Sequence, residues 1–283
     1  MRRAVRISLL CLLFVVWLAC LGLACWRWAT RPFRLPSRGA AAPRRLPSFV
    51  CLTTTPARLR EPWIVENVLR LTRLPGHAGV VLSLPYVMKR TGEAYEVPEA
   101  IAGRASEDPR LLLLRCEDEG PGTKLLGPLR SDRLPADSVL LVCDDDMVYD
   151  GDAFQDLARA VEADVGAVHC FCAKAVRGYI GFGACKRTLL PLLQLQMPES
   201  CFTVDDDYFD GALELLGIRK RAVRPSGCLS CCDCCVFDVA QGWRRLGSDR
   251  HSLTATEVLG SAKRREKQRA CARELRELRR AQA

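Results

Sequence analysis

Three consecutive aspartates, Asp144–Asp146, follow a short apolar run that spans Val139–Cys143. Such a run between polar residues is typical of a strand that is buried on both faces of a sheet. Three adjacent carboxylates repel one another and are costly beside an apolar core unless positive charge lies among them. A hard divalent cation, which prefers oxygen ligands, supplies that charge. Because ligands of open α/β sheets bind beyond the carboxyl ends of the strands, the pattern predicts a cation site here.

The geometry of a strand predicts how these aspartates are oriented. Side chains alternate between the two faces, so we expect Asp144 and Asp146 to point the same way and Asp145 to point elsewhere. The alternative is a solvated acidic turn. The sequence returns at once to apolar residues, Met147–Tyr149, which is unlike most loops and favours the cation site.

A second acidic cluster, Asp205–Asp207, precedes the leucines of a predicted helix that ends near Ile218. Carboxylates are favourable at a helix N-terminus, and this is the purely structural explanation of the cluster. One aspartate is enough to cap a helix, so the cluster leaves a carboxylate that is available for chemistry.

Two further segments have the composition of ligand-binding loops. The turn Gly120–Gly122 leads into a predicted helix that opens with Thr123 and Lys124. A helix N-terminus and a lysine together attract phosphate, although the spacing is not that of a P-loop. The alternative is a capped turn with a solvated lysine. The second segment, Arg177–Leu190, has three glycines among aromatic residues, and glycines permit close approach of the backbone to a ligand.

Short apolar runs and helical periodicities alternate along the chain and must position these residues. The alternation predicts an α/β fold with a mostly parallel sheet covered by helices. The predicted strands span Ser48–Thr53, Gly79–Leu84, Leu111–Arg115, Val139–Cys143 and Val165–Phe171, and the predicted helices begin near Pro62, Thr123, Asp152, Lys186 and Val204.

The two ends of the chain differ from this central part. Residues 7–25 carry no charge and are long enough to cross a bilayer as a helix. We predict an uncleaved signal-anchor, with a cleaved signal peptide as the alternative. The expected organisation is a cytoplasmic tail at 1–6, the anchor, a Pro- and Arg-rich linker at 26–47, one domain at 48–260, and a charged, solvated C-terminal helix at 261–283. This predicts a single-pass type II membrane protein.

The composition restricts the partners and the compartment. The formal net charge is +9, but much of the excess lies at the two ends. No aromatic residues interleave with the C-terminal basic run, which argues against a nucleic-acid partner. The 16 cysteines are too many for a typical cytosolic enzyme and favour a compartment that permits disulfide bonds. Five of them lie in Cys228–Cys235, where the spacing does not specify a zinc site, so we expect disulfides.

Taken in order, several of these segments resemble small GT-A-fold, glycosyltransferase 2-like enzymes that contain a D-x-D motif. The resemblance extends over about 48–252 and depends on five segments: Thr53–Leu59, Gly120–Leu126, Asp144–Asp146, Gly178–Gly181 and the second acidic cluster with Leu216–Ile218. It implies a GT-A-like, Rossmann-like fold with a mixed, mostly parallel sheet. It also implies a nucleotide-sugar donor, Mn²⁺ or Mg²⁺, a glycan, glycoprotein or glycolipid acceptor, and, in a eukaryote, the lumen of the Golgi or ER.

The resemblance further implies roles for single residues. Asp144 and Asp146 match the D-x-D pair that holds the metal against the donor diphosphate, and His251 matches a histidine that completes the metal shell. Asp205 or Asp206 matches the base that takes the acceptor proton in an inverting enzyme, and we favour Asp206. Three aspartates stand where a Glu-Asp pair is commoner, which leaves the base assignment open. The implied donor contacts are Thr54, Arg58, Lys124, Asp145 and Gly181.

Two other classes compete with this prediction. A haloacid-dehalogenase-type phosphatase would use Asp144 as nucleophile and Asp146 as acid and base, with Lys186 and Asp206 as its later residues. Against it, the strand at 165–171 does not end in Ser or Thr, and the D-x-D motif lies deep in the chain. The other class is a non-catalytic, membrane-anchored metal-binding protein, but an EF-hand needs glycine where Tyr149 stands. We therefore predict a metal-dependent glycosyltransferase.

Overall fold

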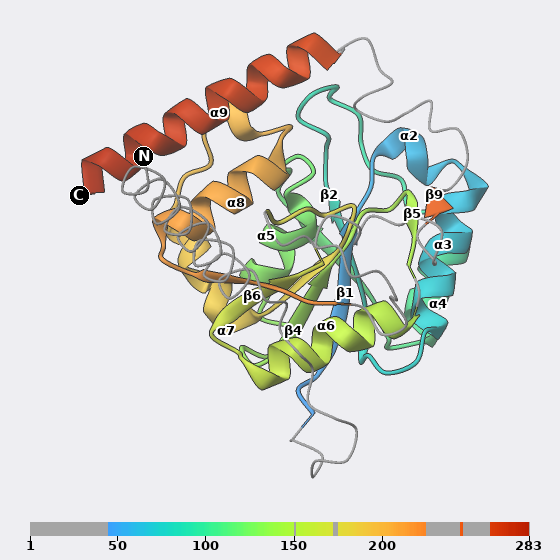
Figure 1. The fold of residues 1–283 in the computed structure, drawn as a ribbon. Coiled ribbons are helices and arrows are strands. Elements are labelled where there is room, and N and C mark those ends of the chain that lie inside the picture. The colour runs from blue at the N-terminus through green and yellow to red at the C-terminus, as the bar shows by residue number, and fades with distance from the viewer. Residues whose placement is uncertain (1–44, 150, 172–174, 225–243, 246–260, 283) are drawn as a thin grey trace, which may run out of the picture.

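The computed structural model describes residues 45–149, 151–171, 175–224, 244–245 and 261–282. Figure 1 shows these residues arranged as a central sheet with helices on both sides of it. Four predicted features lie wholly or mostly outside the described residues: the tail and anchor at 1–25, the linker at 26–47, the cluster Cys228–Cys235, and His251. None of the described helices is both long and apolar enough to cross a membrane.

The secondary structure agrees with the predicted alternation of strands and helices. The strands are β1 (Ser48–Thr53), β2 (Gly79–Pro85), β3 (Leu111–Cys116), β4 (Val139–Val142), β5 (Met147–Val148), β6 (Ala167–Cys170), β7 (Phe182–Cys185), β8 (Arg219–Ala222) and β9 (Arg244–Arg245). The α-helices are α2 (Pro56–Leu59), α3 (Pro62–Arg73), α4 (Glu99–Glu107), α5 (Thr123–Arg130), α6 (Gly151–Ala163), α7 (Lys186–Leu189), α8 (Asp205–Leu215) and α9 (Ser261–Gln282), and the 3-10 helices are η1 (Leu190–Gln194) and η2 (Glu199–Cys201).

The direction of the strands decides which loops meet at one edge of the sheet. The order of the 7-stranded sheet is β3-β2-β1-β4-β7-β6-β8. The first four strands in this order, β3, β2, β1 and β4, all run parallel to one another. β7 runs antiparallel between β4 and β6, and Val142 at the end of β4 pairs with Phe182 at the start of β7. The loop after β4 and the segment before β7 therefore come together at the carboxyl edge, where ligands of α/β sheets bind.

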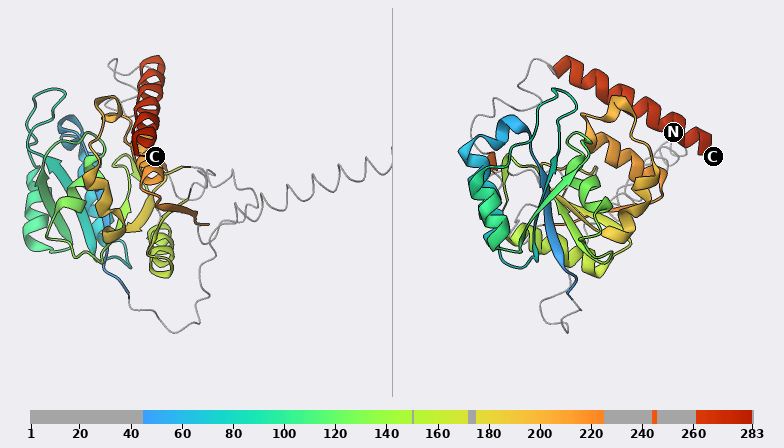
Figure 2. Two further views of the ribbon diagram at one scale, coloured as in Figure 1. Left: turned by 90° about the vertical axis from the view of Figure 1, so that its left-hand side faces the viewer. Right: turned by 180° about the vertical axis from the view of Figure 1, so that it is seen from behind.

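Both faces of the sheet are buried, as the apolar strands predict. Val50 and Leu52 of β1 belong to a core shared with α3, α4 and α6, whereas Cys51 belongs to the core under α5 and α8. The views in Figure 2 show the two layers of helices on opposite sides of the strands. Alternate side chains of one strand thus enter different cores. The predicted fold class, a mixed and mostly parallel sheet flanked by helices, is confirmed.

The glycine-rich segment at 177–190 contains a strand, β7, that was not among the predicted strands. Its Gly183 pairs with Leu141 of β4 in the middle of the sheet. A Cβ atom at position 183 would lie 3.0 Å from a methyl carbon of Leu141. Gly183 therefore allows β7 to pack closely against β4. A glycine is not typical of a strand interior, which is why the sequence did not predict this strand.

The sequence predicts a charged, solvated C-terminal helix, and most side chains of this helix are exposed or partly exposed, but two of them are buried against the domain. The helix forms as α9, but Cys271 is fully buried and forms a disulfide with Cys201 of η2. Leu275 is also buried and packs against Gly211 of α8, where an added Cβ would lie 2.7 Å from a Leu275 methyl carbon. A helix that is charged over most of its surface is thus attached to the domain through a few inward-facing residues.

Candidate active site

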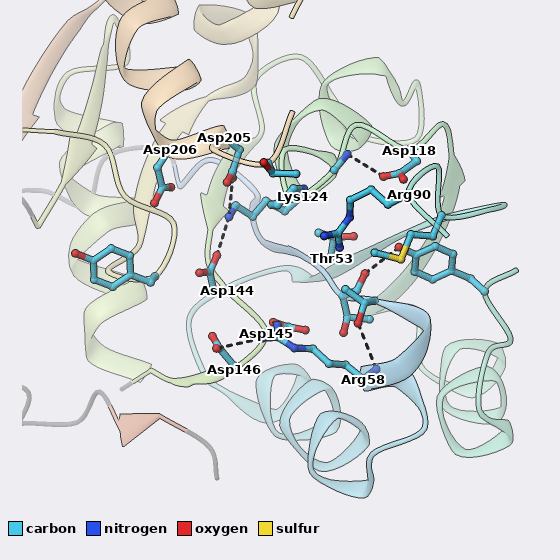
Figure 3. A pocket seen from close by; sticks show the side chains of 18 of the residues that line it. Thr53, Arg58, Arg90, Asp118, Lys124, Asp144, Asp145, Asp146, Asp205 and Asp206 are labelled. Carbon is cyan, nitrogen blue, oxygen red and sulfur yellow. Dashed lines mark hydrogen bonds and ion pairs between the residues drawn. The ribbon is translucent and has the colours of Figure 1, made fainter. Parts of the chain in front are cut away.

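A pocket opens at the carboxyl edge of the sheet, between the loops after β1 and β4 and the start of α8. Figure 3 shows that side chains from both acidic clusters come together there. The residues predicted for the site that line this pocket are Thr54, Arg58, Lys124, Asp144, Asp145, Asp146, Asp205 and Asp206. The structure therefore joins segments that are far apart in the sequence. Gly181 is not among the lining residues, and His251 lies outside the described part of the chain.

The three aspartates after β4 do not continue the alternation of the strand, because β4 ends before them. Their carboxylates pair with two different cations (Figure 3). Asp144 lies 2.7 Å from the ammonium of Lys124, whereas Asp145 and Asp146 both pair with the guanidinium of Arg58. The prediction that Asp145 is directed elsewhere is wrong, because Asp145 and Asp146 share one partner at the pocket.

Lys124 joins the two acidic clusters. Its ammonium lies 2.7 Å from Asp144 and 2.9 Å from Asp205, and its side chain is only 4% exposed. Burial by itself lowers the pKa of Lys124, but the neighbouring carboxylates, first that of Asp144, outweigh burial and raise the pKa well above its usual value. Lys124 is therefore a buried, fully charged residue. The alternative prediction, a capped turn with a solvated lysine, is wrong.

The backbone at Gly178 is packed directly against this ion pair. A Cβ atom at position 178 would lie 2.5 Å from the Lys124 nitrogen and 2.8 Å from a carboxylate oxygen of Asp144. The Gly178 amide also donates a hydrogen bond to Asp206 at 2.7 Å. The close approach predicted for the glycine-rich segment thus occurs at Gly178. At Gly181 a Cβ would lie 3.7 Å from the buried ring of Tyr149, and Gly181 is not among the residues that line the pocket.

Gly178→Ala is expected to displace the ends of the Lys124 and Asp144 side chains, and to lower the free energy of unfolding by about 1 kcal/mol, the low end of the cost of overpacking, because both side chains border the pocket. Unfolding by urea measures this change. Gly103→Ala is the control, because nothing lies within 4 Å of a Cβ at position 103 and alanine favours the helix there. Equal stability of the 178 variant and the wild type would contradict the proposed close contact.

Asp206 and Asp205 have different environments although they are adjacent in the first turn of α8. Asp205 is neutralised by Lys124, whereas no described residue forms an ion pair with Asp206. Burial, followed by the charge of Asp205, raises the pKa of Asp206 to about 7. A carboxylate with a pKa near neutrality is a good general base, since it is both available and able to hold a proton.

The loop after β1 supplies the opposite wall of the pocket. Thr55 caps α2, its hydroxyl accepting a hydrogen bond from the Arg58 amide at 3.3 Å, and Pro56 begins the helix. This single turn directs the Arg58 side chain toward the aspartates. Burial raises the pKa of Asp145 to about 6, although Arg58 acts in the opposite direction. Thr54 is buried at the same wall, and its carbonyl accepts a hydrogen bond from Tyr95 at 3.2 Å.

Two buried residues that hold the acidic loop were not predicted. The Asn67 amide of α3 donates hydrogen bonds to the carbonyls of Asp145 (2.8 Å) and Met147 (3.3 Å). The Tyr149 hydroxyl accepts from the Asp144 amide at 3.0 Å and lies 3.2 Å from the Gly178 carbonyl. A signal for Asn67 was present in the sequence, because it is a polar residue at helical spacing from the apolar residues Ile64 and Leu71 of its helix.

The other lining residues were not predicted as site residues, among them Arg90, Asp118, Tyr179 and Arg264. Asp118 fixes the Gly-Pro-Gly turn, because its carboxylate accepts from the amides of Lys89 (2.7 Å) and Gly120 (2.8 Å). Arg264 comes from α9, the helix that the sequence assigns to a solvated tail. No local pattern in the sequence marks Arg90 or Arg264 as a pocket residue, because both reach the pocket only through the fold.

The donor atoms at the pocket fit a hard divalent cation that shares its coordination shell with a phosphate ligand. Among the described lining residues, six aspartates face four basic side chains, which leaves a formal charge of −2. Carboxylate oxygens suit Mg²⁺ and Mn²⁺. No three or more acidic, histidine or cysteine side chains of the described residues form a cage for a metal. Mg²⁺ is commonly held by one or two carboxylates together with substrate phosphates, and the site is compatible with that arrangement.

No protein-family model matches the chain, and no curated protein matches it significantly. Any assignment of function therefore depends on the chemistry of the pocket. That chemistry combines oxygen ligands for a cation, a buried lysine and a partly buried arginine that are suited to phosphate, and one carboxylate suited to accept a proton.

Proposed function

We propose that the protein is a metal-dependent glycosyltransferase with a GT-A-like fold. It transfers a sugar from a nucleotide-sugar donor to a hydroxyl group of a glycan, glycoprotein or glycolipid. The observation that carries this proposal is the meeting of the two acidic clusters at Lys124, in one pocket at the carboxyl edge of the sheet. A metal-binding loop and a base must face the same substrate in such a reaction. The proposal includes a type II membrane anchor at 7–25 and a lumenal catalytic domain.

The donor is bound by the residues on the β1 and β4 side of the pocket. Arg58 and Lys124 are cations that now pair with carboxylates, and a diphosphate offers them equivalent oxygen partners. Asp144 and Asp146 would hold Mn²⁺ or Mg²⁺. When bound, the ion neutralises the charge that develops on the leaving diphosphate. Asp145, held by Arg58, keeps this guanidinium beside the metal-binding carboxylates.

The transfer step uses Asp206 as the base of an inverting reaction. The acceptor oxygen forms a bond to the anomeric carbon as the bond from that carbon to the phosphate oxygen breaks. The hydroxyl proton moves to the Asp206 carboxylate, and the nucleoside diphosphate leaves with the bonding electrons. Asp205 is less suited to this role because Lys124 neutralises it.

Asp146→Asn is expected to keep the fold and to weaken metal-dependent binding of UDP or GDP by about 10-fold or more, because a neutral amide is a poor ligand for a hard cation. Calorimetry with UDP, GDP and CMP, with and without Mn²⁺, measures this effect. The control is Asp137→Asn, an exposed residue that pairs with Arg187 outside the pocket. Equal nucleotide affinity in the wild type and the 146 variant would remove Asp146 from the metal site.

The phosphatase hypothesis is less compatible with the positions of the residues around the pocket. Lys186 would have to contact the transferred phosphate, but its ammonium donates to the carbonyls of Ser131 (2.5 Å) and Leu134 (2.9 Å) and does not line the pocket. Covalent phosphoryl trapping at Asp144 tests this alternative directly. A phosphorylated Asp144 would favour the phosphatase, whereas metal-dependent transfer or hydrolysis of a nucleotide sugar would favour the glycosyltransferase.

A further inference from the structure

Four residues of α9 lie at the spacing that places them along one side of a helix: Arg264, Gln268, Cys271 and Leu275. Three of them attach the helix to the domain. Gln268 donates a hydrogen bond to Asp207 at 2.8 Å, Cys271 forms the disulfide with Cys201, and Leu275 packs against α8. Figure 1 shows α9 running beside α8 at the outside of the domain. The fourth residue, Arg264, is therefore also directed inward.

Arg264 differs from the other three because it lines the pocket and has no hydrogen-bond or ion-pair partner among the described residues. Its position is unfavourable for helix stability. The first turn of α9 contains no acidic residue, and Arg264 follows Lys263 at the end where the helix dipole is positive. A cation held at this end, beside a pocket, is stabilised when an anion binds there.

The contacts of α9 also indicate which part of the substrate Arg264 faces. Gln268, one helical turn away, bonds to Asp207, the residue next to the proposed base Asp206. Arg264 thus approaches from the α8 side, whereas Thr54 and Arg58 approach from the β1 side. In the proposed reaction the α8 side is where the acceptor hydroxyl lies, since the base takes its proton.

We propose that Arg264 binds an anionic group, a carboxylate or a phosphate, on the acceptor sugar, so that the enzyme selects a charged glycan acceptor. This inference depends on the proposed function, because it assigns the acceptor side of the same pocket. The planar guanidinium of arginine forms two parallel hydrogen bonds with either group, and a neutral hydroxyl does not neutralise its charge. The disulfide and the Gln268 contact hold the helix that presents Arg264.

The test measures sugar binding to the full chain in detergent, saturated with Mn²⁺ and whichever of UDP and GDP binds more tightly. The probes are two matched pairs: methyl glucuronide with methyl glucoside, and glucose 6-phosphate with glucose. We expect the wild type to bind at least one charged sugar about 10-fold more tightly than its neutral partner, as a charge-assisted hydrogen bond would provide. The pair that shows the preference distinguishes a carboxylate from a phosphate.

Arg264→Gln is expected to abolish the preference for the charged sugar over its neutral partner, and Arg264→Lys is expected to keep part of it. The control is Arg269→Gln, which removes the same charge from an exposed position of α9. Equal binding of charged and neutral sugars by the wild type would overturn the inference, as would a preference that persists in Arg264→Gln. Weaker nucleotide binding in Arg264→Gln would assign Arg264 to the donor instead. Absence of metal-dependent nucleotide binding in the wild type would contradict the proposed function itself.

Discussion

Asp206→Asn is expected to lower the rate of sugar transfer by about 10²- to 10⁴-fold and to leave donor binding unchanged, which is the usual effect of losing a general base. The amide still accepts the hydrogen bond from the Gly178 amide, so the start of α8 keeps its position. What it loses is the ability to take the acceptor proton. Transfer is measured with the donor and acceptor that a panel of UDP- and GDP-sugars identifies, and donor binding is measured by calorimetry.

Asp207→Asn is the matched control for this variant. Asp207 lies in the same turn of α8, but it contacts Gln268 and Arg177 and does not line the pocket. Asparagine still accepts the hydrogen bond from Gln268, so the control should transfer sugar at close to the wild-type rate. Full activity of Asp206→Asn would remove Asp206 as the base, and equal losses in both variants would point to a disturbed helix.

The same carboxylate predicts a dependence on pH. The transfer rate should rise with pH through about 7, because the base acts only after it has lost its own proton and its pKa is about 7. Stability should change in the opposite direction. The folded-state pKa lies above the usual value of 3.8, so the stability from this group is complete below about pH 4 and is lost as the pH rises to about 7. Urea unfolding at several pH values should show a smaller decline in Asp206→Asn.

Lys124→Met is expected to lower the free energy of unfolding by about 3 to 5 kcal/mol, because removing one member of a buried ion pair leaves the other charge uncompensated. The lysine side chain is 4% exposed, and its carboxylate partners Asp144 and Asp205 are 30% and 9% exposed. Urea unfolding in the presence of a chelator measures the loss. Added Mg²⁺ should restore part of it, since a divalent cation brings positive charge to the same carboxylates.

Lys220→Met separates this effect from the general loss of a lysine. Lys220 also pairs with two carboxylates, Asp210 at 2.8 Å and Glu214 at 2.9 Å, but this pairing lies nearer the surface. Its removal should therefore cost only about 0 to 1 kcal/mol. Similar losses for the two lysine variants would show that Lys124 is not the central charge of the site.

The local sequence was sufficient to predict most of the elements that carry the site. The run Val139–Cys143 is apolar without interruption, and its first four residues form β4 in the interior of the sheet. The helix at 62–73 has apolar residues at helical spacing, and it covers one face of that sheet. Both predictions depend on residues that are close together in the chain, and the spacing of apolar residues in the sequence indicates such local structure directly. The same reasoning places the three aspartates just after β4, where they line the pocket.

The pairing of charges was decided only by the tertiary structure. Lys124 lies between Asp144 and Asp205 because parallel strand order brings the start of α5, the loop after β4 and the start of α8 to one edge of the sheet. The strand order cannot be read from the periodicity of the sequence. For the same reason the expected alternation of the three aspartates failed: the strand ends first, and Arg58 from a distant turn decides where two of the carboxylates point.

The C-terminal helix shows the same division between local and tertiary effects. Its charged composition correctly predicts a helix, because charged residues with long side chains favour helical backbone. Its attachment depends on Cys271 and Leu275, which find their partners on η2 and α8. Sequence therefore determined the elements and the chemical types at their ends, through interactions within a few residues. Only the packing of elements distant in the chain determined which charges meet, and hence which residues form the pocket.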